Sequence, residues 1–399
     1  MNLLYFTLEG FDTPNPNNQL AETMIEYFLN NGIDVDLIQS TRLHINNDIP
    51  DRLKNYKSLN VYNLERKVVG KTNFIKRYIE ESTFFLKSIK ILKKNKKKYD
   101  AVYVQSNATI VWTILFFKIF LRKPINYVIY DIFPGQSMSL GVVKNKYLYN
   151  IFQLIQKIAY RCSKHIIVLS DDMKKTLVDM KIPQSKIFVI YPWYDENVFR
   201  KIEKDKNRLY DDLNLDRNSF YIQYAGSLGQ NFDEKFIYEL ASKISNNNIK
   251  ILLIGDGVKK EEIKDYIRKK KIKNIILRDR QDLSIINLVY NATDIGIVPL
   301  KREVIKNGFP SKVCQLLACG KPIITHSDKS LYTDLINNNN LGYATFNYKY
   351  DNLIDEIFKL YNNKEYYSYI SNNCLKYAKN NYTSSTNCKK LLNVLVKEV

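Results

Sequence analysis

The sequence is poor in the residues that build disulfide frameworks and metal sites. Its 399 residues contain only three histidines, scattered along the chain, and five cysteines, which are odd in number and lack the spacing of zinc ligands. A disulfide-stapled chain or a metal site is therefore not expected, and few free cysteines favour a reducing compartment. The residues in question are His44, His165, His326, Cys162, Cys314, Cys319, Cys374 and Cys388.

Long apolar runs are missing as well. The most apolar stretch, residues 108–121, is shorter than the roughly 20 residues that span a bilayer, and Lys118 interrupts it. We expect a buried helix of a soluble domain there. Residues 1–8 have no basic leader and no small-residue cleavage site, and they are typical of a first strand. These features predict a cytoplasmic protein, peripheral at most on the inner face of the cell membrane.

Acidic residues are fewer than basic ones. The chain has 41 Asp and Glu and 61 Lys and Arg, which gives a formal net charge of +20. This sign suits nucleic acid, an anionic membrane or an acidic substrate. Nucleic acid is the least favoured of the three, since no recognised binding module appears and the aromatic residues are spread evenly.

The positive charge is concentrated in residues 54–98, with fourteen Lys and Arg against three Glu. Helical spacing in this segment predicts an apolar helix face. One interpretation is a domain helix with a solvated basic face. The other is a surface on anionic lipid, where each basic side chain contributes about 1 kcal/mol, through Lys87, Lys90, Lys94 and Lys97. The positions of the apolar face are Ile75, Tyr78, Ile79, Ser82, Phe85, Leu86, Ile89 and Leu92.

Short apolar runs alternate with longer helical stretches in both halves of the chain. Such runs are typical of parallel strands covered on both faces, so we predict an α/β protein with two doubly wound sheets. We place the N-terminal domain at 1–195 and the C-terminal domain at 196–399, with the last helices able to cross back. Ligands of such sheets bind at the carboxyl ends of the strands, so chemistry is expected in the cleft between the domains. The predicted strands are 2–8, 34–38, 101–104, 126–130, 165–169, 187–190, 221–225, 250–254, 274–277, 295–298 and 322–325.

The segment 308–322 carries the strongest local signal. Pro310 can open a helix, Ser311 can cap it, and Gly320 can end it before the strand at 322–325. Lys312 opposes the helix dipole in the first turn, which makes an anionic ligand such as phosphate more plausible. The alternative is an ordinary capped helix with an exposed lysine.

Glycine-containing turns follow two predicted strands of the second half. Gly226, Ser227, Leu228 and Gly229 come directly after 221–225, and the turn around Asp256 comes after 250–254. Glycines at such places let the backbone approach a diphosphate closely. One such turn is weak evidence for a phosphate-binding site. The two turns and the segment 308–312 together are stronger evidence.

Three aspartates of the first half are candidates for chemistry. Asp131 follows the strand at 126–130, where a carboxylate could accept a proton or orient a hydroxyl, or merely cap the next turn. Asp34 and Asp36 form an Asp-x-Asp pattern on one side of an early strand. No supporting cluster accompanies them, and we assign that pattern to chance.

The order and spacing of several segments resemble retaining glycosyltransferase family 4, with its GT-B architecture of two facing Rossmann-like domains. The resemblance covers nearly the whole chain and is closest to the branch that builds bacterial capsule, O-antigen and other surface polysaccharides on lipid carriers. The segments that carry it are KYDAVY at 98–103, YDIFP at 130–134, AYRCS at 159–163, VIYPW at 189–193, YAGSLG at 224–229, ATDIGIVPL at 292–300, PSK at 310–312 and GKPII at 320–324.

The resemblance implies transfer of a sugar, of hexosyl or N-acetylhexosaminyl type, from a nucleotide donor, usually UDP-linked, to a lipid-linked saccharide. It implies retained configuration, no metal and no other cofactor, and an anionic membrane as a further partner. Asp131 and Lys312 would be catalytic, with Lys312 also on the phosphates. The donor would be bound by Gly226, Ser227, Leu228, Gly229, Asp256, Arg278, Arg280, Phe309, Pro310, Ser311, Lys312 and Gln315.

Some positions depart from the family pattern. The two family glutamates fall on Asn307 and Gln315, and the usual Arg and Lys after the first C-domain strand fall on Ser227 and near Asn231. Lys312 is then the clearest phosphate-neutralising charge. Two other functions stay open, a nucleotide-sugar epimerase of similar architecture and a non-catalytic nucleotide-binding subunit of a polysaccharide assembly complex.

Overall fold

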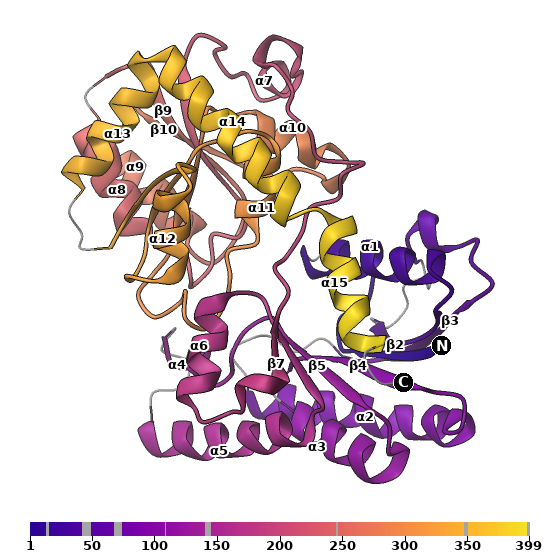
Figure 1. Cartoon of the computed structure of the whole chain (residues 1–399). Helices are drawn as coiled ribbons and strands as arrows, with labels where there is room; N and C mark the ends of the chain where they lie inside the picture. Colours follow the sequence, from indigo (N-terminus) through magenta and orange to yellow (C-terminus); the bar gives the residue numbers. More distant parts are fainter. Residues whose placement is uncertain are drawn as a thin grey trace. The chain divides into compact units, whose positions relative to one another are not determined.

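The computed structural model describes residues 1–12, 16–41, 49–67, 74–107, 109–139, 145–244, 246–346 and 350–396. The chain divides into two compact units, which are considered one at a time (Figure 1). The N-terminal unit comprises Met1–Pro192, Asn307–Phe309 and Ser384–Val399. The C-terminal unit comprises Trp193–Lys306 and Pro310–Thr383.

A seven-stranded parallel sheet forms the centre of the N-terminal unit, in the order β3-β2-β1-β4-β5-β6-β7. Its central strands are buried on both faces, which explains their continuous apolar sequences. The strands are β1 (Asn2–Thr7), β2 (Asp34–Thr41), β3 (Leu59–Glu65), β4 (Ala101–Gln105), β5 (Ile125–Ile129), β6 (His165–Val168) and β7 (Ile187–Val189). The helices are α1 (Pro16–Asn30), α2 (Phe74–Asn95), α3 (Ile110–Phe116) with its continuation η2 (Phe117–Leu121), α4 (Gly135–Ser139), α5 (Lys146–Cys162), α6 (Asp171–Asp179) and α15 (Ser384–Val396), with short turns η1 (Asp51–Leu53) and η3 (Gln184–Lys186).

Helices cover both faces of this sheet. In Figure 1, α2, α3 and α5 lie along one face, and α1 and α15 lie on the other. On the first face, the Phe6 ring of β1 packs 5.2 Å from that of Phe84 and 5.5 Å from that of Phe117. Burying such a side chain contributes about 1.5–3 kcal/mol, so these contacts fix α2 and η2 on the sheet. On the other face, α15 packs against α1 and buries Leu391 and Leu395.

A six-stranded parallel sheet forms the centre of the C-terminal unit, in the order β10-β9-β8-β11-β12-β13. The strands are β8 (Phe220–Ala225), β9 (Ile249–Ile254), β10 (Ile275–Arg278), β11 (Ile295–Pro299), β12 (Ile323–His326) and β13 (Gly342–Thr345). The helices are α7 (Leu209–Asp212), α8 (Glu234–Lys243), α9 (Lys260–Lys270), α10 (Ile286–Asn291), α11 (Lys312–Ala318), α12 (Leu331–Asn338), α13 (Asp351–Asn362) and α14 (Lys364–Asn381), with short turns η4 (Lys204–Lys206) and η5 (Leu283–Ile285).

Both sheets are doubly wound, as the sequence predicts. In each sheet, successive strands are first added toward one edge and then toward the other, so the strand order has one switch point. The reversal lies between β1 and β4 in the N-terminal unit and between β8 and β11 in the C-terminal unit. Ligands of open α/β sheets bind outside the carboxyl ends of the strands at such switch points. We therefore look for the predicted site residues at the carboxyl ends of the strands beside these two switch points.

The most apolar stretch forms α3 and η2, so the prediction of a helix there is confirmed. The expectation that the helix is buried is wrong at three positions, because Lys118 is exposed and Trp112 and Ile119 are 53% and 70% exposed. Within the described residues, no helix is long and apolar enough to cross a membrane.

Candidate functional site

Three turns of the C-terminal unit form one hydrogen-bonded layer at the carboxyl ends of β8, β9 and β10. The backbone N–H of Gly226 donates to the Ile254 carbonyl (2.8 Å), and that of Gly255 donates to the Arg278 carbonyl (3.1 Å). The Leu228 N–H donates to the Asp256 carbonyl (2.9 Å). The glycine turns that the sequence predicts at separate positions thus support one another in space.

Gly226, Gly255 and Gly257 in this layer each have a close neighbour at the position that a Cβ would take. A Cβ on Gly255 would lie less than 3.0 Å from the carbonyl oxygen of Gly226. A Cβ on Gly226, whose φ is +152°, would lie less than 3.0 Å from the Lys312 side chain. Glycine is therefore required at Gly255 by close backbone packing and at Gly226 by the positive φ.

Lys312 is the first residue of α11, and its aliphatic chain crosses Gly226. Its Nζ lies 5.3 Å from the ring centroid of Tyr224, whose hydroxyl donates to the Ser227 carbonyl (2.8 Å). In the part of the chain that the structure describes, no carboxylate lies within ion-pair distance of Nζ. The half-exposed ammonium beside the β8 turn can therefore bind an anion.

Lys259 and Lys301, whose backbone lies beside this turn, are paired with a carboxylate. The buried Glu234 at the start of α8 pairs with Lys259 (2.9 Å) and lies 3.8 Å from Lys301. Burial opposes ionisation of this carboxyl, but its hydrogen bonds, first that from Lys259, and the charges of Lys301 and Lys259 together outweigh burial, so the pKa of Glu234 is lowered. Lys259 and Lys301 are thus committed to Glu234, which distinguishes them from Lys312.

Gln315 lies on α11 three residues after Lys312, so the two share a helix face. Its buried Oε1 accepts no hydrogen bond from the described residues. A buried acceptor without a partner is costly, and a bound hydroxyl would satisfy it.

The start of α11 differs from the prediction in two ways. The helix begins at Lys312 rather than at Pro310, and Ser311 makes no side-chain cap hydrogen bond. Ser311 has helical backbone angles (φ −53°, ψ −26°), whereas a capping residue takes extended angles that bring its oxygen to the next turn. The predicted end is confirmed, because Gly320 follows the helix with φ +68°.

The remaining donor-site candidates are more dispersed. Arg278 donates from Nε and one terminal nitrogen to the Leu213 carbonyl (3.2 and 3.1 Å), so its guanidinium is held by backbone. Arg280 and Asp256 are exposed, and Pro310 is half-buried. Phe309 belongs to the N-terminal unit, where its ring packs 5.9 Å from that of Tyr191.

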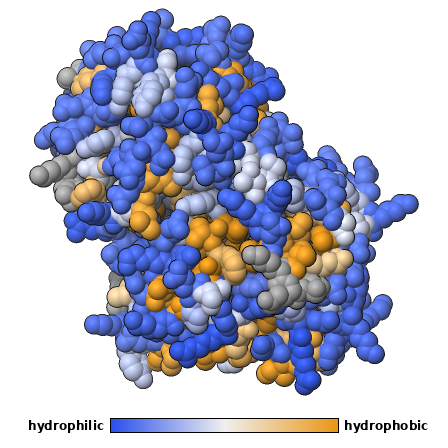
Figure 2. Space-filling model, in the orientation of Figure 1, coloured by the Kyte–Doolittle hydropathy of each residue, from blue (hydrophilic) through white to orange (hydrophobic). Residues whose placement is uncertain are grey.

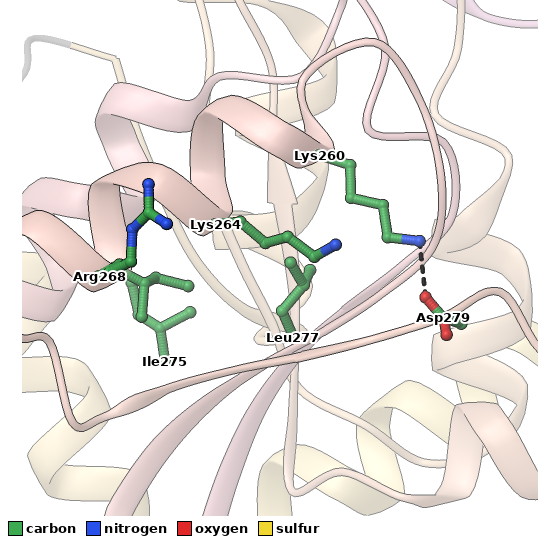
Figure 3. Close-up of a pocket in the computed structure, with 7 residues that line it drawn as sticks. Lys260, Lys264, Arg268, Ile275, Leu277 and Asp279 are labelled. Atoms are coloured by element: carbon green, nitrogen blue, oxygen red, sulfur yellow. Dashed lines mark hydrogen bonds and ion pairs between the residues drawn. The ribbon is translucent and has the colours of Figure 1, made fainter.

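A hollow of about 260 Å³ opens between α9 and β10 (Figure 3). None of the predicted site residues lines it. Its cations are also compensated, since Lys260 pairs with Asp279 at 2.6 Å and Lys264 pairs with Glu261 at 3.0 Å. This hollow is therefore not the predicted donor site. The lining residues are Lys260, Lys264, Ile267, Arg268, Ile275, Leu277 and Asp279.

In the N-terminal unit, Asp131 is exposed directly after β5 and forms a backbone bridge with Gly308. The next residue, Ile132, donates its N–H to the Asn307 carbonyl (2.7 Å). The chain segment Asn307–Phe309 thus fixes the backbone on either side of the Asp131 carboxylate.

A polar cluster that the sequence does not reveal lies at the β1–β4 switch point. The Gln105 amide nitrogen donates to Glu9 (3.0 Å), and the Thr7 hydroxyl donates to the Gln105 oxygen (2.6 Å). Burial, and the nearby Glu9 carboxylate, raise the pKa of Tyr130, so its hydroxyl stays protonated as a donor. Glu9 and Gln105 lie about a hundred residues apart in sequence, which is why no local motif marks them.

Of the two aspartates in the Asp-x-Asp pattern, Asp36 has a structural role. Asp36 is buried and receives hydrogen bonds from Lys98 (2.6 Å), Asn60 (2.8 Å) and Tyr99 (3.1 Å). Asp34 is exposed at the start of β2. Asp36 of β2 thus holds the start of β3 and the residues that precede β4.

The four lysines of the predicted acceptor and membrane surface are all exposed on or just after α2. Lys87 donates to the Glu65 carbonyl (2.7 Å). The others are Lys90, Lys94 and Lys97.

Comparison with known proteins gives one match for each half. Residues 18–198 match the model "Glycosyltransferase Family 4", and residues 205–377 match "Glycosyl transferases group 1". The chain is 24% identical over 263 residues to the capsular polysaccharide biosynthesis glycosyltransferase CapM of Staphylococcus aureus, over 63% of this chain and 66% of that protein. It is 22% identical over 204 residues to the probable glycosyltransferase WbjE of Pseudomonas aeruginosa, over 51% of this chain and 50% of that protein.

The chain thus spans about two thirds of the first of these relatives and half of the second. Among solved structures, Anabaena Alr3699/HepE in complex with UDP and glucose aligns over 100% of both chains with a TM-score of 0.74 and 14% identity. With two doubly wound parallel sheets and structural neighbours that align over the full length, the chain has the GT-B fold, and each of its halves matches a glycosyltransferase model.

Proposed function

We propose that the protein transfers a sugar from a nucleotide-sugar donor to a lipid-linked saccharide during synthesis of a bacterial surface polysaccharide, such as capsule or O-antigen. The observation that carries the proposal is the ammonium of Lys312 against the Gly226 turn, without a carboxylate partner in the described residues, at the switch point of the C-terminal sheet. The relative CapM, named for capsular polysaccharide biosynthesis, supports the choice of pathway class.

The donor is assigned to the C-terminal unit and is UDP-linked in this proposal. Alr3699/HepE, which has the same fold, has been solved with UDP and glucose. Lys312 would bind the diphosphate, and the backbone of Gly226 to Gly229 would lie against the diphosphate or the sugar. Gln315 would accept a hydrogen bond from a ribose hydroxyl through its unpartnered Oε1. Arg280 would lie near the base.

Transfer with retention of configuration is the proposed outcome. When the bond between sugar and diphosphate breaks, negative charge grows on the departing phosphate. A fixed cation beside that oxygen stabilises the transition state more than the ground state, which is the effect that accelerates the reaction. Lys312 supplies that charge in the proposal, and no metal is assigned a role. Addition of a chelator should accordingly leave the transfer rate unchanged.

Nucleotide binding is the first expectation to test. A UDP-sugar at a hundred times its Kd would stabilise the protein by about 2.7 kcal/mol and raise Tm by roughly 5–10 °C. A thermal-shift panel of UDP-, GDP- and other nucleotide sugars measures this, with Gln315→Ala expected to reduce the shift. Absence of a shift with every nucleotide would contradict the donor assignment.

The acceptor is assigned to the N-terminal unit, with Asp131 as the group that orients or deprotonates its hydroxyl. Changing Asp131 to asparagine is expected to lower kcat/KM for the acceptor by about a hundredfold, because general-base assistance contributes at least that much. The thermal shift with donor should not change. Asp179→Asn, at an exposed carboxylate of α6, is the matched control. An unchanged rate in the Asp131 variant would remove this residue from the mechanism.

The same assays separate the two alternative functions. An epimerase would convert the donor without any acceptor, which product analysis after incubation with donor alone detects. A non-catalytic subunit would show the thermal shift but no turnover over a panel of lipid-linked acceptors.

A further inference from the structure

β10 is an edge strand of the C-terminal sheet and pairs with β9 on one side only. On that side, the Arg278 carbonyl accepts a hydrogen bond from the Gly255 N–H (3.1 Å). Alternate residues of a strand direct their backbone groups to opposite edges. The N–H and C=O groups of Ile275 and Leu277 therefore point away from β9, where the sheet has no further strand.

Most of these outward groups are unpaired. Among the described residues, one of the four has a hydrogen-bond partner, the Leu277 carbonyl, which accepts from the neighbouring Arg278 guanidinium (3.2 Å). The sequence of β10 is Ile-Ile-Leu-Arg, with no proline and no lysine to block pairing at the edge. A row of such groups is a template on which a second chain can add a strand.

The hollow of about 260 Å³ lies beside this edge, between β10 and α9 (Figure 3). Its floor is aliphatic and consists of the buried Ile275 with the half-buried Ile267 and Leu277. This floor contrasts with the mostly hydrophilic surface that the C-terminal unit presents in Figure 2. An added strand would direct alternate side chains toward α9, where an aliphatic side chain can occupy the hollow.

The charges next to the hollow are mainly positive. The segment 266–278, which contains the end of α9 and the whole of β10, has six basic residues and no acidic residue. Four of its lysines are exposed and make no ion pair with the described residues. A chain that paired with β10 would therefore be attracted if it carried carboxylates. The four are Lys269, Lys270, Lys271 and Lys273.

Two basic side chains on the rim of the hollow have partners within α9. Lys264 pairs with Glu261 (3.0 Å) and Arg268 pairs with Asp265 (2.8 Å), and all four side chains are more than half exposed. Exposed pairs of this kind add little to stability. A carboxylate of a bound chain can therefore replace Glu261 or Asp265 at little cost.

We propose that the edge of β10 and the hollow beside it bind an extended acidic segment of a partner protein as an added strand. An aliphatic side chain of that segment would occupy the hollow, and its carboxylates would lie against the basic residues of 264–273. The inference goes beyond the proposed function and does not depend on it. A second copy of this chain is less favoured, because pairing of two β10 edges would bring two basic segments together in a protein of net charge +20.

A short synthetic peptide that alternates glutamate with valine or leucine, labelled with fluorescein, is the probe. Fluorescence anisotropy with the full chain measures its affinity. Two further peptides carry N-methyl groups either on the glutamate nitrogens or on the aliphatic nitrogens. Since alternate N–H groups of a strand face opposite edges, one of these peptides should lose about tenfold or more in affinity while the other binds nearly as before.

Variants of the groove test its floor and its charges separately. Ile267→Ser is expected to lower the affinity about tenfold at low and high salt, because the hollow loses part of its aliphatic floor. Lys271→Gln/Lys273→Gln is expected to lower it several-fold at low salt only, because salt screens exposed charges. Lys376→Gln/Lys379→Gln removes the same charge from exposed positions of α14 and should bind like the parent. The Tm of each variant separates loss of binding from loss of folding.

Four outcomes would overturn the inference. One is no binding of the unmethylated peptide, and another is an equal effect of both methylation patterns, which indicates attraction by charge alone. The third is a dimer in solution that Ile267→Ser dissolves, and the fourth is binding to vesicles of phosphatidylglycerol but not to the peptide. These measurements use neither donor nor acceptor, so their failure is distinct from failure of the proposed function.

Discussion

Replacement of Lys312 by alanine is expected to lower kcat/KM for sugar transfer by about a hundredfold to a thousandfold, the usual effect of removing one group that stabilises developing negative charge. The reason is that Lys259 and Lys301 beside this turn are already paired with Glu234, so these two lysines are not available to replace Lys312. Steady-state kinetics with saturating acceptor measures the loss. Most of it should appear in kcat, because the charge on phosphate grows as the bond breaks.

Two further variants make this result specific. Lys312→Arg keeps the charge but presents a planar, larger group, and it should recover only part of the activity. Lys264→Ala, at an exposed lysine of α9, should behave like the parent. If Lys312→Ala retained full kcat while its Tm was unchanged, the phosphate role of this residue would be refuted.

Gly255→Ala is expected to cause the largest loss of stability. The added methyl group would meet the Gly226 carbonyl oxygen, which is backbone and cannot rotate away. Overpacking of this kind costs about 3 kcal/mol, which corresponds to a Tm lower by roughly 6–12 °C for a unit of this size. Differential scanning calorimetry measures the shift, and donor affinity should fall with it because the same layer holds the Gly226 turn.

Gly229→Ala is the matched control in the same turn. Its nearest neighbour would be the Ser227 hydroxyl at 3.0 Å, the end of an exposed side chain that can move. We expect a Tm within about 2 °C of the parent. Equal losses from Gly229→Ala and Gly255→Ala would show that the hydrogen-bonded layer is not what limits these positions.

The central strands of both sheets could be predicted from the sequence because burial on both faces demands continuous apolar runs. The two strands that the prediction missed, β3 and β13, are both edge strands, one in each sheet, whereas the other two edge strands, β7 and β10, were predicted. In β3, partly exposed positions are filled by Asn60 and Asn63, and β13 has only four residues beginning with Gly342. Edge strands have one neighbour and more water, so their composition resembles that of loops.

Helix faces were harder to predict, because periodicity shows that an apolar stripe exists but not what it packs against. In α2, the predicted apolar face includes Ile79 and Leu86, which are 57% and 62% exposed, and Leu92, which is buried. The buried side is formed by Phe84 and Leu92 together with the polar Glu81 and Ser88. In this helix, apolar spacing therefore does not identify the buried positions.

For the candidate site, the sequence predicted both Gly226 and Lys312 but not that the lysine chain would lie on the glycine. That contact joins positions more than eighty residues apart, and it depends on the β8–β11 reversal that only the strand order reveals. The same holds for Glu9 and Gln105, which β1 and β4 bring together. Turns can be predicted from local sequence, whereas contacts across a switch point can be predicted only when the strand order is known.

The position of α15 has a consequence for how the protein folds while it is being synthesised. This helix follows the whole C-terminal unit in the chain, yet it packs on α1 and supplies Leu391 and Leu395 to the N-terminal unit. Proteins generally fold domain by domain as the ribosome releases them, N-terminal parts first. Here the first unit to emerge would wait, with the apolar side of α1 uncovered, until residues 384–396 had been synthesised. The nascent chain would therefore be most open to chaperones and to aggregation through α1 during translation of the second unit.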